Sequence, residues 1–408
     1  MQRWLAGLAF WVVMLAGLSR PAPGQNLVEG LPLDRLGRIY GLTVVQSEKM
    51  ELLAATGEGL YRTRPEGRAV AQAGLQGHLM GFSALGGGGA LLAGGHPGGK
   101  GSIGLLRSED GGRVWTQVAP RGAGDEGFHL LAASGAKAGT VYGLAAGLRV
   151  SNDGGRAWQD TGSLPEGLIH LAASARKVDT LYAATRGGLL ISHDRGGTWQ
   201  PVAHPPGIAA MVHVSPPGRV FLFVVGQGLL AADEEALRWQ TLSRDFQDQV
   251  LVRMTDDHAN PARLYGVTLT NAIVTSGDGG KSWGAYEGAH LARPESIARG
   301  KQLFQTYCQV CHGADGRGQQ TTPGFDPKNP PAIAAPALDN SAHAWHHSDE
   351  NLRTTILEGS PREGSPMVAW KHQLSPADAD ALVAYIKSLW NFRSAACQGA
   401  RHMACMRQ

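Results

Sequence analysis

SNDGGRAW, residues 151–158, recurs with small changes along the first two thirds of the chain. The other copies are SEDGGRVW from Ser108, SHDRGGTW from Ser192 and SGDGGKSW from Ser276. Successive copies begin 43, 41 and 84 residues apart, and 84 is twice 42, so the spacing predicts a worn copy between the last two. A repeat of this length is typical of folds built from one repeated supersecondary unit.

Two worn copies complete the series. Residues 226–239, GQGLLAADEEALRW, keep Asp233 and Trp239 but lack the serine and the glycine. Residues 57–67, GEGLYRTRPEG, are a second worn copy, upstream of the others. The sequence therefore predicts six units.

Each unit contains the same short segments, for example LIHLAAS, TLYAAT, GGLLIS, the octapeptide and then TWQPV. These are runs of β-favouring or small residues between turn signals, without a helical period. Four strands in about 43 residues match a β-propeller blade. We therefore expect an all-β propeller of about six four-stranded blades.

The residues of the octapeptide suit a tight turn between two strands. Its aspartate can accept backbone N–H bonds, its glycine can adopt a positive φ, and its tryptophan can pack over the hairpin. The aspartates are Asp110, Asp153, Asp194 and Asp278. These octapeptides resemble the Asp-boxes of bacterial neuraminidase repeats, found in sialidases, sortilin-like propellers and photosystem assembly-factor propellers. The resemblance covers about residues 38–288 and implies a structural box on the blade rims.

The repeat does not by itself indicate a glycosidase. That reading needs a carboxylate pair or a tyrosine nucleophile and, for sialidases, an arginine cluster. GRIYG, residues 37–41, matches the arginine motif of sialidases only weakly. Histidines recur on the first strands of units at uneven offsets, so we expect ordinary strand histidines rather than one metal-binding ring. They are His78, His129, His170 and His213.

YCQVCHG, residues 307–313, has the Cys-x-x-Cys-His pattern of c-type haem attachment. Cys308 and Cys311 lie one helical turn apart and can bond the two vinyl groups of one haem, with His312 as proximal ligand. A redox dithiol would follow a strand in a βαβ unit, and a zinc site would need a second ligand pair at matching distance. We therefore expect one covalent haem c.

The surrounding sequence turns helical after Pro294. Ser375 is placed to cap a helix that begins at Pro376. Residues 294–392 resemble a monohaem class I cytochrome c, in which the N-terminal and C-terminal helices cross. The resemblance implies that Gly300 and Phe304 meet Tyr385 at this crossing. We also expect Ser348 to cap a helix ending at Gly359.

The same resemblance implies a methionine as the sixth iron ligand. Met367 lies 55 residues after His312 on a loop before the last helix, so it is the expected distal ligand. His372, His346 and His347 are the alternatives. The family also places a proline-region carbonyl on the proximal imidazole, and Asn329 or Pro330 is the expected acceptor.

The last residues, 393–408, extend beyond a class I cytochrome. Cys397 and Cys405 enclose seven residues and would form a disulfide in an oxidising compartment. The alternative is a small Cu(I) site that also uses the nearby imidazole and thioethers. Those groups are His402, Met403 and Met406.

Residues 1–24 have the layout of a cleaved secretory signal peptide. The formal net charge of +3 over 408 residues, without a basic block, gives no support for a nucleic-acid partner. We expect four segments: the signal peptide at 1–24, the propeller at 25–290, an all-α haem domain at 291–392 and the tail at 393–408.

These segments predict a periplasmic electron-transfer protein that has a redox protein partner and no membrane span after signal cleavage. The haem would cycle between Fe(II) and Fe(III), and the propeller would dock a partner or organise a complex. The alternatives are a redox enzyme or glycoside hydrolase with its site in the propeller, and a copper-handling or assembly protein using the tail.

Overall fold

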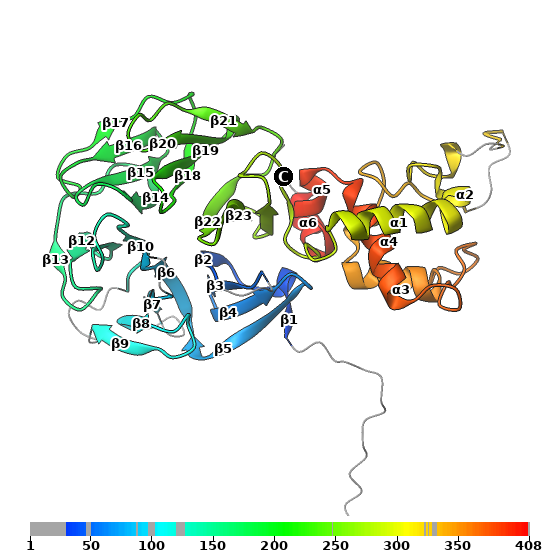
Figure 1. The fold of residues 1–408 in the computed structure, drawn as a ribbon, viewed down its shortest axis with the longest axis horizontal. Coiled ribbons are helices and arrows are strands. Elements are labelled where there is room, and N and C mark those ends of the chain that lie inside the picture. Colours follow the sequence, from blue (N-terminus) through cyan, green and yellow to red (C-terminus); the bar gives the residue numbers. More distant parts are fainter. Residues whose placement is uncertain are drawn as a thin grey trace, which may run out of the picture.

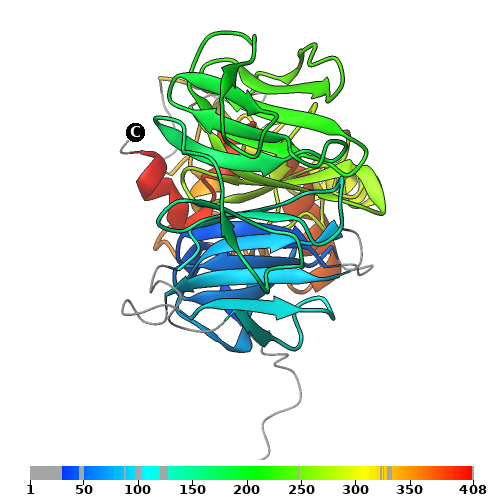
Figure 2. The same cartoon turned by 90° about the vertical axis from the view of Figure 1, so that its left-hand side faces the viewer.

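The computed structural model describes residues 30–45, 50–86, 89–96, 103–119, 127–246, 248–321, 324, 326–328 and 333–406. Six antiparallel sheets stand around a common axis, with a small helical domain beside the ring (Figure 1). In Figure 2, which views the ring from the side opposite the helices, the sheets lie in front of the helices. The predicted six-bladed propeller followed by an all-α domain is confirmed. The predicted signal peptide, residues 1–24, lies outside the described residues.

Consecutive strands form each blade. Blade 1 contains β1 (Leu31–Pro32), β2 (Ile39–Val44), β3 (Leu52–Thr56), β4 (Gly59–Arg64) and β5 (Arg68–Gln76), and blade 2 contains β6 (His78–Ala84), β7 (Leu91–His96), β8 (Leu105–Ser108) and β9 (Thr116–Ala119). Blade 3 contains β10 (Leu130–Ala133), β11 (Val141–Leu144), β12 (Leu148–Ser151) and β13 (Gln159–Asp160). Blade 4 contains β14 (Leu168–Ala173), β15 (Leu181–Thr185), β16 (Gly188–Ser192) and β17 (Gln200–Pro201). Blade 5 contains β18 (Ala209–Val214), β19 (Arg219–Val224), β20 (Gly228–Asp233) and β21 (Gln240–Ser243), and blade 6 contains β22 (Leu251–Asp257), β23 (Asn260–Thr268), β24 (Ile273–Ser276) and β25 (Gly284–Ala285).

Within each blade the strands are hydrogen-bonded in chain order, and in blade 1 β1 pairs with the outer strand β5. The first full strand of each blade lies next to that of its neighbour, so β2, β6, β10, β14, β18 and β22 surround the axis. Alanine and glycine are frequent on the inner strands because little room is left at the axis.

The boxes fold as the sequence predicts. In blade 3, Asp153 Oδ1 accepts hydrogen bonds from the backbone N–H groups of Arg156 and Ala157, at 3.0 and 2.9 Å. Gly155 has a φ of +94°, and a Cβ at this position would lie 2.5 Å from Leu105 Cδ2 of the preceding blade. The box therefore closes its hairpin and also allows close packing between blades.

The worn box in blade 5 keeps Asp233, as the sequence predicts. Asp233 is the last residue of β20, and its Oδ1 accepts a hydrogen bond from Glu235 N of the turn at 2.9 Å. Its carboxylate also pairs with Arg176 at 3.2 Å. The next residue, Glu234, donates from its backbone N–H to Gly218 O, as Gly154 does to Gly139 O in blade 3. The turn of this box is therefore capped by one backbone hydrogen bond to the aspartate instead of two.

The ring closes between blades 1 and 6 without exchange of a strand between the two. Asn271 of blade 6 accepts a hydrogen bond from Ile39 N at 2.8 Å and donates to the carbonyl oxygen of Leu36 at 3.2 Å. Tyr286, which is fully buried, donates from its hydroxyl to Met50 O at 2.6 Å. Side-chain hydrogen bonds and packing therefore hold this seam.

The helical domain contains α1 (Pro294–Tyr307), α2 (Gln309–His312), α3 (Asp349–Glu358), α4 (Pro376–Ser388), α5 (Phe392–Ala396) and α6 (His402–Cys405). Helices α1 and α4 cross where Gly300 lies against the backbone carbonyl of Ala381, so no larger residue would fit at 300. The rings of Phe304 and Tyr385 meet there, with centroids 5.1 Å apart. This crossing, and the caps by Ser348 and Ser375, were predicted from the sequence and are confirmed.

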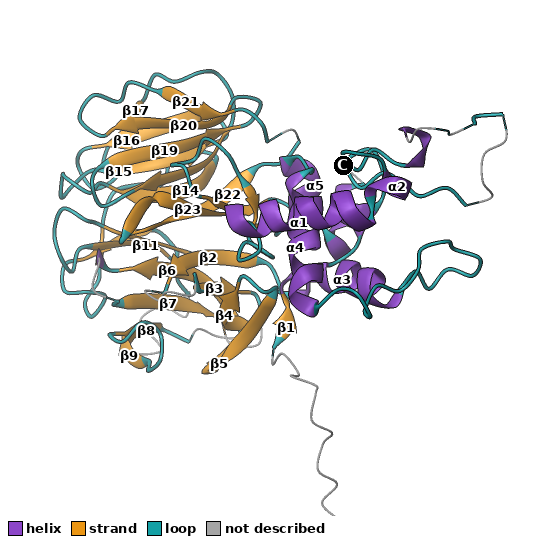
Figure 3. Cartoon of the chain, turned by 45° about the vertical axis from the view of Figure 1, so that its right-hand side comes forward, coloured by secondary structure: helices purple, strands orange, loops and turns teal. Residues whose placement is uncertain are grey.

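The last residues fill the angle between the helical domain and the propeller (Figure 3). Phe392 and Ala396 share an apolar core with residues of blades 5 and 6, and the Phe392 and Phe246 ring centroids are 4.8 Å apart. Cys397 and Cys405 belong instead to the core of the helical domain. The tail therefore has one face in each domain.

Polar contacts surround the apolar core that Phe392 and Ala396 form with the propeller. Arg401 pairs with the partly buried Glu287 at 3.3 Å, and Lys387 Nζ donates to Glu287 O at 2.7 Å. Blade 1 takes part as well, because Asp34 Oδ2 accepts from Ala400 N at 3.3 Å. The helical domain thus lies across the seam between blades 1 and 6.

Candidate functional site

The Cys-x-x-Cys-His segment lies at the C-terminal end of α1 and in α2. Cys311 N and His312 N both donate to Cys308 O, at 3.1 and 2.9 Å, so the segment forms one helical turn. Cys308 is half-buried, Cys311 is exposed, and both are free thiols. The turn brings the two thiols and the imidazole to one side of the helical domain.

The imidazole of His312 is oriented by a backbone carbonyl. His312 Nδ1 lies 2.8 Å from Pro336 O, and because a carbonyl only accepts, Nδ1 carries the proton. Nε2 is then a lone pair available to a metal. The predicted acceptors Asn329 and Pro330 lie outside the described residues, and the carbonyl that contacts the imidazole belongs to Pro336, so that prediction is wrong. The segment after the attachment motif is long, and its sequence offers several prolines as acceptors.

A cavity of about 180 Å³ opens beside this turn. Met367 lines it together with Cys308, Cys311 and His312, and Tyr307 and Trp370 form one wall with their rings in edge contact, 5.2 Å between centroids. The structure therefore brings together all four residues predicted to hold haem. The three alternative ligands His346, His347 and His372 do not line this cavity.

Burial sets the electrostatics of the cavity. Desolvation, with a smaller contribution from Cys311, raises the pKa of the Cys308 thiol to about 12, so it is protonated at neutral pH. Desolvation also lowers the pKa of His312, although the hydrogen bond to Pro336 opposes the shift. The imidazole is therefore held neutral, as metal coordination requires.

The cavity lies at the end of the helical domain far from the propeller. Helix α1 begins near the ring, and α2, which lines the cavity, lies at the far end of α1 (Figure 1). Val310 and Val368, with 74% and 57% of their surfaces exposed, also line the cavity. The propeller therefore does not cover this cavity.

A second cavity of about 330 Å³ runs along the propeller axis and is lined by the inner strands of all six blades. Of the recurring histidines, His170 and His213 line it, whereas His78 and His129 do not. His213 Nε2 lies 2.6 Å from Asp256 Oδ1. As expected, the histidines do not form one ring, and no metal-binding group of three or more His, Cys, Asp or Glu occurs among the described residues.

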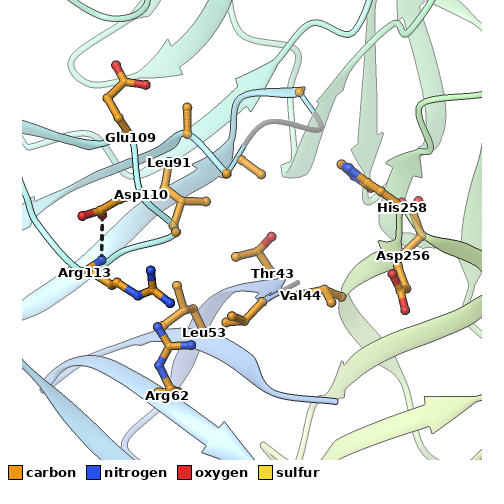
Figure 4. A pocket seen from close by; sticks show the side chains of 17 residues that line it. Thr43, Val44, Leu53, Arg62, Leu91, Glu109, Asp110, Arg113, Asp256 and His258 are labelled. Carbon is orange, nitrogen blue, oxygen red and sulfur yellow. Dashed lines mark hydrogen bonds between the residues drawn. The ribbon is translucent and has the colours of Figure 1, made fainter. Parts of the chain in front are cut away.

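A groove of about 400 Å³ adjoins the axial cavity, with which it shares Thr43, Asp256 and His258. Figure 4 shows Arg62 and Arg113 on one side of this groove and Asp256 and His258 on the other. The Asp110 carboxylate in this groove belongs to a box turn and bonds to Arg113 N at 3.0 Å. Asp256 is the axial cavity's only carboxylate among the described residues, so a glycosidase carboxylate pair is missing there.

The tail cysteines Cys397 and Cys405 form a disulfide. A bonded sulfur pair offers no thiolate to Cu(I). His402 stacks on His346 with centroids 4.5 Å apart, and its Nδ1 bonds to Gly399 O at 2.7 Å. His402 is therefore engaged in packing, and the thioethers of Met403 and Met406 are exposed.

Comparison with known proteins supports the assignment of the helical domain. The Cytochrome c family matches residues 297–390. The cbb3-type cytochrome c oxidase subunit FixP of Bradyrhizobium diazoefficiens is 27% identical over 124 residues, which is 30% of this chain and 37% of FixP. The chain thus covers well under two thirds of that relative. Within the described residues, none of the helices has the length and apolar character needed to cross a bilayer.

Solved propellers resemble the ring. The GH74 xyloglucanase of Xanthomonas campestris is 22% identical, with a TM-score of 0.44 over 61% of this chain and 38% of that one. YCF48 bound to D1 peptide is 19% identical, with a TM-score of 0.41 over 64% of this chain and 86% of that one. At these values neither likeness says anything about the activity of this chain.

Proposed function

We propose that this chain, which ends in a cytochrome c domain, is a periplasmic electron-transfer protein carrying one covalently bound haem c. The domain limits we propose are 25–290 for the propeller, 291–392 for the haem domain and 393–408 for the tail, after a signal peptide at 1–24. The cytochrome c family implies the covalent haem, whose iron gains and loses one electron.

The residues of the cavity fit this group. Cys308 and Cys311 would form the two thioethers, His312 Nε2 would be the proximal ligand, and Met367 would be the distal one. The observation that carries the proposal is the hydrogen bond from His312 Nδ1 to Pro336 O in the cavity that Met367 also lines. It fixes the tautomer that exposes Nε2.

The position of the cavity indicates where a redox partner would dock. Val310 and Val368 are exposed and line the cavity, and α2, which contains Val310, lies at the end of the helical domain far from the ring (Figure 1). A periplasmic protein partner would approach this face. The propeller would hold the haem domain in place and organise other components of a complex.

The glycoside hydrolase alternative has little support, because the axial cavity has one described carboxylate and His213 already binds it. The copper-handling alternative is weakened by the disulfide between the tail cysteines. Substrate-dependent reduction of the haem in the purified protein would revive the redox-enzyme alternative.

Visible spectra of the protein after periplasmic expression test the proposal. The wild type should keep its haem after acid–acetone extraction and give six-coordinate spectra in both redox states. Met367→Ala should retain covalent haem but bind carbon monoxide when reduced, because it lacks the thioether. Met406→Ala is the matched control, since Met406 is 62% exposed on the tail. Loss of haem on extraction, or equal carbon monoxide binding by both variants, would contradict these assignments.

A further inference from the structure

The polar groups of the axial cavity gather on neighbouring blades. His170 comes from β14, His213 from β18, and Arg253 and Asp256 come from β22. The remaining lining consists mostly of small and apolar residues of the inner strands. An apolar cavity with a few convergent polar groups is the usual form of a small-molecule site.

Arg253 has no carboxylate partner among the described residues. Its Nε donates to Tyr40 O and its Nη1 to Val252 O, both at 2.6 Å. A guanidinium has five N–H groups, and two of those of Arg253, which lines the cavity, are used in these bonds. Burial and the nearby charge of Arg38 lower the pKa of Arg253 to about 10, which still leaves it charged at neutral pH.

The carboxylate of Asp256 cannot serve as the missing partner. It is already engaged by His213 at 2.6 Å. Along β22 it lies three residues from Arg253, which is roughly 10 Å in an extended strand. The two backbone carbonyls therefore hold a charged guanidinium that lines the cavity and has no carboxylate partner among the described residues.

His170 supplies an acceptor beside this cation. Its Nδ1 lies 2.9 Å from Val212 O, which can only accept, so Nδ1 carries the proton and Nε2 has a free lone pair. Burial and the charge of Arg253 lower the pKa of His170 to about 3, so the ring stays neutral. Arg253 thus offers donors and His170 offers an acceptor in the same cavity.

We propose that the axial cavity binds a small organic hydroxy acid, with its carboxylate on Arg253 and its hydroxyl donating to His170 Nε2. A carboxylate matches the fork of a guanidinium, and a hydroxyl is the donor that a neutral imidazole nitrogen lacks. The cavity volume of about 330 Å³ suits an organic molecule rather than a bare inorganic anion. This site is separate from the haem cavity and does not depend on it.

Isothermal titration of the full-length haem-loaded protein tests the site, with L-malate, succinate and inorganic phosphate as probes. L-malate should bind, and succinate, which lacks the hydroxyl, should bind roughly tenfold more weakly. Phosphate should bind more weakly than malate because it fills little of the cavity. Arg253→Gln should weaken malate binding by roughly tenfold to hundredfold. The control Arg219→Gln, at an exposed position on β19 outside the cavity, should bind malate like the wild type.

The haem spectrum and thermal unfolding of each variant establish that it is folded. If Arg253→Gln does not fold, Arg253→Lys is the second variant. It keeps the positive charge but lacks the two parallel N–H donors of the guanidinium, so it should still weaken malate binding. Equal malate affinity in the wild type and either Arg253 variant would overturn the proposal. So would the absence of heat for the wild type at about 10 mM malate, well above ordinary weak affinities. Equal affinity for malate and succinate would refute the role of His170.

Discussion

Replacing Phe392 by alanine is expected to loosen the helical domain from the propeller. Phe392 is 4% exposed and lies in an apolar core built mainly by blades 5 and 6, against the ring of Phe246. Because Phe392 is the last residue of the helical domain, at the start of α5, and its neighbours come from the propeller, its burial stabilises the docking of one domain on the other.

The magnitude follows from the burial. Truncation of a buried phenylalanine to alanine costs about 3–5 kcal/mol, and each 1.4 kcal/mol is a tenfold change, so the docking constant should fall by about 10²–10⁴. The peripheral ion pair of Arg393 with Asp248 is partly exposed and contributes at most about 1 kcal/mol. Loss of the tail disulfide, which joins residues separated by 8 positions, would cost about 2.5 kcal/mol in the chain-entropy estimate.

Hydrogen exchange of the tail measures this effect. Ala400 N donates to Asp34 Oδ2 of blade 1 at 3.3 Å, so this amide is protected only while the two domains are docked. Phe392→Ala should speed exchange here while leaving the inner strands unchanged. Leu269→Ala, which alters a 58% exposed leucine of the ring, is the control.

Equal exchange in Phe392→Ala and the control would refute the reasoning, since Phe392 would then contribute nothing to docking. Uniformly faster exchange in all blades would also count against it, because it would indicate general destabilisation. The Cys397→Ser, Cys405→Ser double variant should shift exchange in the same direction as Phe392→Ala, by a smaller amount.

Three further outcomes are expected. Burial lowers the pKa of His170 in the folded state to about 3, below the usual 6.5, so protonation below about pH 6.5 favours the unfolded chain. The free energy of unfolding of the wild type should therefore fall between about pH 7 and 5. In urea unfolding, His170→Gln should lose up to about 2 kcal/mol less than the wild type over this range. Asp153→Ala should destabilise the ring by about 1–2 kcal/mol, because several hydrogen bonds of its box turn are lost, whereas Asp233→Ala should cost under about 1 kcal/mol by the same assay. Gly300→Ala should lower the melting temperature of the haem domain by separating α1 from α4, at a cost of about 1–3 kcal/mol, while Gly147→Ala, with open space around its Cα, should not.

The blades and the helix crossing could be predicted because short-range patterns encode them. The period of about 42 residues located the worn copy between the last two boxes, and the pair Gly300 and Phe304 marked a close helix contact. The caps by Ser348 and Ser375 depend on residues within one turn. The helix caps and the turns of the boxes each depend on residues that are close together in the sequence.

What could not be predicted depends on distant residues. The acceptor Pro336 follows a long insert whose path no local pattern fixes. The docking role of Phe392 could not be predicted, because α5 has five residues and is too short to show a periodic pattern of apolar residues. The burial of Glu234, which follows the worn box aspartate, has no signal in the sequence. Arg253 and His170 come from different blades, and only the closed ring brings them to one cavity.

The seam between blades 1 and 6 also sets the order in which the protein can be completed. Asn271 and Ile39, which join the two ends of the ring, are 232 residues apart. At a synthesis rate of roughly 5–20 residues per second, blade 1 waits about 12–50 s for its neighbour to be made. During that time the nascent ring has two unpartnered apolar flanks, which is when chaperone binding would matter most. The helical domain emerges last and covers the joint after it forms.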